Sequence, residues 1–102
     1  MSEEKGRVDF TIVPDEPGEG ERLYSNFCAI HHTPFDFTLT FCEVLPPSER
    51  QLREAQSTHV VKAPVRVRIA IPFQMVPGLI AALQDNFRIY QESFGPPRGP
   101  AN

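Results

Sequence analysis

The hydrophobic period of this chain changes once, at Pro72, and the change limits the folds it can adopt. Before Pro72 apolar residues alternate with polar ones, most clearly at Phe37, Leu39 and Phe41, which is the pattern of half-buried strands. After Pro72 they recur every three or four residues, which is the pattern of an amphipathic helix. This helical set comprises Val76, Leu79, Ile80, Leu83, Phe87, Tyr90 and Phe94. Strands followed by one helix predict an α+β domain.

Four segments have strand character: residues 8–13, 22–31, 36–44 and 59–71. His32-Thr-Pro-Phe35 separates the second from the third and predicts a hairpin turn. We therefore predict a mostly antiparallel four-stranded sheet, a β-meander, with the C-terminal helix packed on one face. Pro64 cannot donate a ladder hydrogen bond, so the start of the last strand is expected at an edge or a bulge.

The segment between the third and fourth strands has two interpretations. Ser48 followed by Gln51 is a capping-box pattern, which predicts a short helix over residues 48–56. Pro46 and Pro47 just before it are equally compatible with a solvated loop. The sequence leaves both open.

The charge divides the chain into an arm and a body. Residues 1–21 hold seven acids and two bases, a net charge of −5, and the rest holds six acids and eight bases, a net charge of +2. We expect residues 22–95 to form a single domain, with residues 1–21 as an acidic arm and linker and 96–102 as a disordered tail. No apolar run reaches the roughly 20 residues of a membrane span. Without a signal-peptide pattern, the two cysteines are expected as free thiols in a cytoplasmic protein.

The expected hairpin register leaves one sheet face without cover. Placing Ile30 opposite Phe37 puts Cys28, Leu39 and Phe41 on the helix-covered face with them. The other face is half apolar and carries Phe27, Ala29, Thr38, Thr40 and Cys42. Uncovered apolar patches usually mark interfaces, and cyclic dimers are the commonest soluble assembly. We predict a homodimer that buries this face or pairs an edge strand.

Five pieces of the sequence form a recognisable set: Tyr24-Ser-Asn-Phe27, His32-Thr-Pro-Phe-Asp-Phe-Thr-Leu-Thr-Phe41, Ala82-Leu-Gln-Asp-Asn86, Tyr90 and Phe94-Gly95. In their combined spacing they resemble an uncharacterised bacterial and archaeal family, domain of unknown function thirty-four sixty-seven. The resemblance covers residues 23–95, and the chain departs from it at Pro72-Phe-Gln-Met-Val-Pro77, where a second proline is added at the helix start. The family carries no assigned activity, so the resemblance implies no catalytic residues.

No set of residues predicts catalysis or a cofactor. Cys28, His31, His32 and Cys42 are metal-ligand types, but the register places the two cysteines on opposite sheet faces, and a zinc site needs its ligands around one ion. Cys28 and His31 also lie on opposite faces, which disfavours a nucleophile–base pair. We expect neither an enzyme nor a metal or cofactor site.

A basic strip, defined as Lys62, Arg66 and Arg68, is the remaining candidate site. These bases are either a solvated outer face or a docking strip for an acidic partner or nucleic acid, and the docking hypothesis assigns them to an unidentified protein partner. The leading hypothesis is a non-catalytic, homo-oligomeric adaptor or accessory protein. One alternative is a holdase chaperone, since strands followed by a long helix are similar in outline to SecB, although fold alone does not establish function. The other is weak nucleic-acid binding through the basic strand, although the charge is low for a dedicated nucleic-acid protein.

Overall fold

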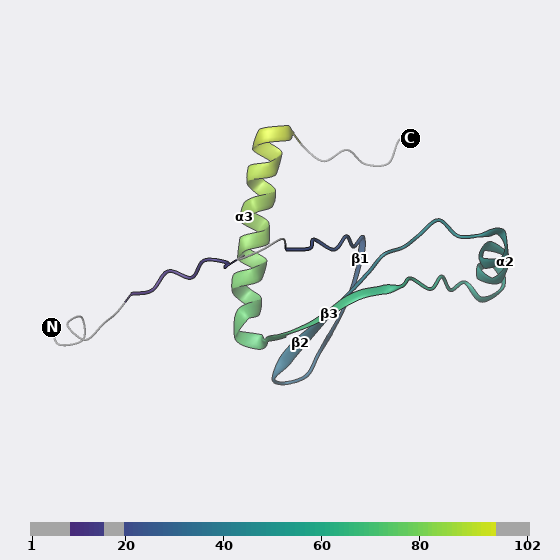
Figure 1. Cartoon of the computed structure of the whole chain (residues 1–102), viewed down its shortest axis with the longest axis horizontal. Coiled ribbons are helices and arrows are strands. Elements are labelled where there is room, and N and C mark those ends of the chain that lie inside the picture. The colour runs from purple at the N-terminus through teal and green to yellow at the C-terminus, as the bar shows by residue number, and fades with distance from the viewer. Residues whose placement is uncertain (1–8, 16–19, 96–102) are drawn as a thin grey trace.

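The computed structural model of the chain describes residues 9–15 and 20–95. In these residues it has three strands, β1 (Phe27–His32), β2 (Asp36–Cys42) and β3 (Val65–Pro72), the helices α2 (Glu49–Thr58) and α3 (Val76–Phe94), and a 3-10 turn, η1 (Phe73–Met75). The strands form one antiparallel sheet in the order β1-β2-β3 (Figure 1). The α+β class, the antiparallel sheet and the C-terminal helix are thus confirmed.

The predicted strand over residues 8–13 is not formed. Its described part, residues 9–13, has no regular secondary structure, and Phe10 and Ile12 are exposed. Alternating residues become a strand only when an edge pairs with them, and the sheet pairs only β1, β2 and β3 among the described residues. The rest of the predicted acidic arm (1–8 and 16–19) and the predicted tail (96–102) lie outside the described residues.

The β1–β2 turn is tighter than the sequence suggested. Thr33 N–H donates to the carbonyl of Asp36 at 2.9 Å, which leaves Pro34 and Phe35 as a two-residue loop. The Thr33 hydroxyl stabilises this loop: it donates to Asp36 Oδ1 at 2.8 Å and accepts from the N–H groups of Phe35 and Asp36 at 3.1 and 3.2 Å. These local side-chain hydrogen bonds select the shorter turn.

The tighter turn shifts the hairpin register by two residues. Ile30 pairs with Leu39, where the sequence had suggested Phe37, and Phe37 pairs with His32. Because side chains alternate between faces with a period of two, a shift of two leaves each of them on its predicted face.

β3 begins at Val65, six residues later than predicted. Pro64 has no N–H for a ladder bond, although its carbonyl still accepts from Glu43 N–H at 3.0 Å. The register slips between Phe41 and Cys42, beside this point. Residues 59–64 instead run with residues 43–48 as two arms that carry α2 away from the sheet (Figure 1).

The capping-box pattern does start a helix. Ser48 Oγ accepts from Gln51 N–H at 3.2 Å, and Ser48 N–H donates to Gln51 Oε1 at 2.8 Å. α2 ends at Thr58 and is capped by His59, which has a φ of 59° in the left-handed region and whose N–H donates to the carbonyl of Ala55. The helical interpretation of this segment is therefore correct, and the helix runs further than residue 56.

α3 does not pack across its own sheet, and this part of the fold prediction is wrong for the single chain. β3 continues through η1 directly into α3, and no loop separates these elements. The 3-10 turn between Pro72 and Pro77 therefore sets the direction of the helix. The helix contacts mainly η1 at its own start and projects steeply away from the strands (Figure 1). Among the hydrophobic side chains described, only Cys42 and Ile71 are buried, each 7% exposed.

Candidate interaction surfaces

One face of the sheet is almost entirely apolar. Cross-strand pairing brings together Ile30, Leu39 and Ile69 in the middle of this face. We call it the apolar face, and it comprises Cys28, Ile30, His32, Phe37, Leu39, Phe41, Val67, Ile69 and Ile71. Ile30 remains 60% exposed and Ile69 44% exposed, whereas Ile71 beside η1 is buried. The face is covered at its η1 end and open over its centre.

A second apolar surface runs along α3. Its first turn is partly protected, since Val76 and Leu79 are half-buried. Beyond it lies the helix stripe, which comprises Ile80, Leu83, Phe87, Tyr90 and Phe94, between 44% and 75% exposed. The Tyr90 ring lies 6.2 Å from that of Phe87 and 5.2 Å from that of Phe94, so the stripe ends in an aromatic ridge. The stripe predicted from the sequence is real, but no described part of the chain covers it.

The opposite side of α3 is charged and internally paired. Arg88 donates to Asp85 at 2.7 Å and to Glu92 at 2.9 Å. These hydrogen bonds, first with Asp85 and then with Glu92, raise the pKa of Arg88. The pairs are solvent-exposed and contribute little to stability. In the described part of the chain, no helix is long and apolar enough to cross a membrane.

The second sheet face is mixed in character. We call it the mixed face; the predicted dimer residues Phe27, Ala29, Thr38, Thr40 and Cys42 all lie on it. Phe27 is 53% exposed, whereas Ala29, Thr38 and Thr40 are half-buried and Cys42 is buried. The structure brings the five together at β1 and β2, but Cys42 offers almost no surface to a partner.

The cysteine and histidine side chains are spread over both faces. Cys28 and His32 share the apolar face, and His31 and Cys42 share the mixed face. On each face the cysteine and the histidine lie near opposite ends of the hairpin. Four residue positions separate them along the strands, which is roughly 13 Å at about 3.3 Å per residue. No three His, Cys, Asp or Glu side chains in the described part of the chain are placed to hold one metal ion.

The basic strip is less continuous than predicted. Arg66 and Arg68 lie on β3, but Lys62 precedes the strand and belongs to the arm that leaves α2. Glu43 Oε1 lies 4.0 Å from Arg66 Nε, so one of the three bases has a carboxylate beside it. The strip is therefore a pair of strand arginines with a lysine further along the chain.

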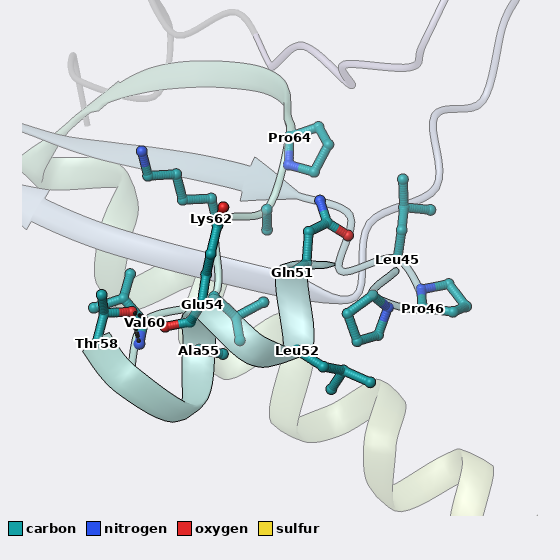
Figure 2. Close-up of a pocket in the computed structure, with 13 residues that line it drawn as sticks. Leu45, Pro46, Gln51, Leu52, Glu54, Ala55, Thr58, Val60, Lys62 and Pro64 are labelled. Carbon is teal, nitrogen blue, oxygen red and sulfur yellow. Dashed lines mark hydrogen bonds between the residues drawn. The ribbon is translucent and has the colours of Figure 1, made fainter. Parts of the chain in front are cut away.

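Sequence reasoning missed a pocket of about 800 Å³ between α2 and its two arms. Leu45 and Pro46 from the incoming arm, Leu52 and Ala55 from α2, and Val60 and Pro64 from the outgoing arm line it (Figure 2). Lys62 and Glu54 supply charge at its side. The capping box was the one signal that could have located it, because the pocket exists only if α2 forms.

The comparisons with known proteins decide the family. A family model described as "Protein of unknown function (DUF3467)" matches residues 1–97. The chain belongs to this family. The resemblance drawn from Tyr24–Phe27, the hairpin and α3 is therefore confirmed, and DUF3467 membership extends beyond those pieces. No curated protein and no solved structure matches the chain.

Proposed function

We propose that this DUF3467 protein is a non-catalytic, homo-oligomeric interaction module, an adaptor or accessory protein of the cytoplasm. The observation that carries the proposal is that residues 9–15 and 20–95 leave the helix stripe and the apolar face uncovered at the same time. Monomeric proteins rarely expose contiguous apolar patches larger than a few hundred Å², and such patches mark interaction sites.

The energetics of the single chain support assembly. Fully burying a Leu, Ile or Phe side chain contributes roughly 1.5–3 kcal/mol, and Leu83, Phe87 and Ile30 are each at least half exposed. Small domains bury a limited share of their surface even when compact. Covering these side chains with a second copy would supply stability that Cys42 and Ile71 alone do not.

The sheet edges support self-association as well. β1 and β3 are the outer strands, and each has one side without a neighbouring strand among the described residues. Unpaired edges are templates for pairing with another chain. A dimer can therefore use an edge, a face or both, and the mixed face with Phe27 remains a candidate surface for the assembly.

The proposal is tested by light scattering over a wide concentration range, with a Leu83→Glu, Phe87→Glu variant beside the parent protein. The parent should be a dimer or larger, and the variant should dissociate because charge cannot be buried in the helix stripe. Arg88→Gln, on the polar side of α3, is the matched control and should assemble normally. A parent protein that stays monomeric at every concentration contradicts the proposal.

A holdase chaperone is the second candidate, and the pocket beside α2 favours it. Its lining is largely aliphatic and proline, which suits an apolar segment of an unfolded chain. The assay is suppression of aggregation of a denatured protein, compared between the parent and Leu52→Glu.

Nucleic-acid binding by the basic strip is less favoured, because Glu43 lies beside Arg66. Filter binding in graded salt tests this alternative.

A further inference from the structure

We infer that α3 of one copy lies on the apolar face of a second copy, and that two chains exchange their helices reciprocally. This inference rests on the proposed self-association and names the surfaces that make it. The helix stripe of one copy packs on the apolar face of the other, whose centre is formed by Ile30, Leu39 and Ile69. Each copy gives one helix and receives one, which closes a two-fold dimer in which neither the helix stripe nor the apolar face is left open for further chains.

The dimensions of the two surfaces agree. α3 has 19 residues, or roughly 28 Å at about 1.5 Å per residue. β3 has 8 residues, or roughly 26 Å at about 3.3 Å per residue. The two outer strands of a three-stranded sheet stand roughly 10 Å apart, which is about the diameter of one helix. One helix therefore covers one apolar face.

A helix of the same chain does not reach this face. Phe73 N–H donates to the carbonyl of Phe35 at 3.2 Å, which ties the start of η1 to the hairpin turn. The 3-10 turn leads into α3 through Val76 with no intervening loop, and Pro77 follows at once. To lie on its own sheet, α3 would have to break this connection, whereas a helix from a second copy meets no such constraint.

The area is sufficient for a stable dimer. The aromatic ridge places Phe87, Tyr90 and Phe94 on the stripe, roughly half or more exposed. Since an aromatic side chain buries about 150–250 Å² when fully covered, the six rings of two copies would bury on the order of 600 Å², and the sheet beneath them a similar area. That reaches the lower end of the roughly 1,200–2,000 Å² of specific interfaces before any aliphatic group is counted.

A helix-to-helix dimer explains less of the structure. Pairing two stripes would cover α3 but would leave Ile30 and Ile69 exposed on both sheets. Helix exchange covers the stripe and the apolar face together, so it removes more apolar surface from water per copy. This difference favours the sheet as the partner of the stripe.

Cys28 provides a built-in reporter, because it lies on the apolar face and is half-buried. In a Cys42→Ala background it is the sole thiol, and Ile80→Cys, Leu83→Cys and Phe87→Cys can be added singly along the stripe. Under mild oxidation at least one variant should give a covalent dimer on a non-reducing gel, twice the 11.5 kDa of one chain. Ala81→Cys is the control, since Ala81 lies about 160° around the helix from Leu83 at about 100° per residue, and it should cross-link no more than the background protein.

The other outcomes separate this inference from the proposed function. A disulfide within one chain, detected by mass, would show that the helix covers its own sheet and would overturn the inference. Cross-linking that persists after Cys28→Ala would show stripe-to-stripe pairing and would also overturn it. So would the absence of any cross-link between folded variants that remain dimeric by light scattering. A monomeric parent protein would overturn the proposed function as well. If the cysteine variants do not fold, Ile30→Glu provides the second test: it should dissociate the parent dimer, as the Leu83→Glu, Phe87→Glu variant is expected to do, and a stable dimer would overturn the inference.

Discussion

The side-chain amide of Asn26 forms two hydrogen bonds with the backbone of Val44, as a residue of a neighbouring strand would. Its Oδ1 accepts from Val44 N–H at 2.7 Å, and its Nδ2–H donates to the Val44 carbonyl at 3.1 Å. Beside it, the Ser25 hydroxyl donates to the Cys42 carbonyl at 2.8 Å. The hairpin is thus extended past β1 by side chains, and the first arm leaves the sheet only after Val44.

Replacing Asn26 with Ala should loosen this end of the hairpin. Both hydrogen bonds are lost, and since a typical protein hydrogen bond contributes about 0.5–1.5 kcal/mol, the free energy of unfolding should fall by about 1–3 kcal/mol. Hydrogen exchange should show faster exchange of Val44 N–H, while Thr33 N–H, which donates to the Asp36 carbonyl at the other end of the hairpin, serves as an internal control. Unchanged protection of Val44 would show that water replaces the amide without loss.

Ser48→Ala should destabilise α2 with little effect on the sheet. The substitution removes the side-chain half of the capping box, and such changes cost about 1 kcal/mol of helix stability. Because the pocket depends on α2, chemical shifts of Leu52 and Ala55 should move toward random-coil values, and those of β2 should not. Thr58→Ala is a comparison at the other helix end. Equal shifts throughout the protein would show that α2 and the sheet unfold as one unit.

Local patterns in this sequence predicted local structure well. The period-two segment gave β2, the 3.6-residue stripe gave α3, and Ser48 with Gln51 marked the start of α2. The faces of the hairpin were also correct, because the register error was an even number of residues. What failed were the long-range relations. Two features depend on tertiary contacts: whether the segment around Phe10 pairs with an edge of the sheet, and where α3 lies. The periodicity of nearby residues does not determine either of them.

The placement of α3 shows why the site was only partly predictable. The sequence indicated an apolar stripe and an apolar sheet face, and pairing them within one chain was the simplest arrangement. The connection through η1 decides otherwise, because Pro72 and Pro77 bound a turn whose direction cannot be read from residue types. The same residues that were expected to form an internal core therefore become a candidate interface.

Leu83→Ala should destabilise the assembled protein and do so through association. Leu83 is 62% exposed in the single chain, so its loss costs little there. When the site is buried in a dimer, a large-to-small change costs about 2–5 kcal/mol. Thermal unfolding at several protein concentrations should show a lower midpoint for the variant and a concentration dependence for both proteins. A cost below about 0.5 kcal/mol at high concentration would show that the stripe stays solvent-exposed.

Phe27→Glu tests whether the mixed face is used in addition to the apolar face. Phe27 is the most accessible large side chain among the predicted dimer residues on that face. If the mixed face contributes, the buried charge should reduce the assembly size by light scattering. Thr38→Val, on the same face, is a control that adds no charge and should preserve assembly. An unchanged size for Phe27→Glu would restrict the interface to other surfaces.

The last prediction concerns the basic strip and the acidic arm. Arg66 and Arg68 are two residues apart on β3, about 7 Å along the strand, and the register shift between Phe41 and Cys42 lies beside Arg66. Glu43 neutralises part of this charge at Arg66. The arm, residues 1–21, carries a net charge of −5 and the body +2, so the arm can compete with an acidic partner for the strip. Deleting residues 1–21 should therefore strengthen partner binding, and salt should weaken it, because exposed charges are screened within about 8–10 Å at physiological ionic strength.

The deciding comparison uses two variants with the same change in net charge. Lys62→Glu, Arg66→Glu, Arg68→Glu reverses the strip, whereas Arg22→Glu, Arg50→Glu, Arg53→Glu reverses three exposed bases elsewhere. Both are first checked for fold by circular dichroism and for assembly by light scattering. In a pull-down from native lysate, the strip variant should lose partners that the control retains, because binding through specific positions depends on where the charge lies and not only on its sum. If the strip variant recovers every partner of the parent protein, Arg66 and Arg68 form only a solvated outer surface of β3. If both variants lose the same partners, the attraction is a non-specific effect of net charge.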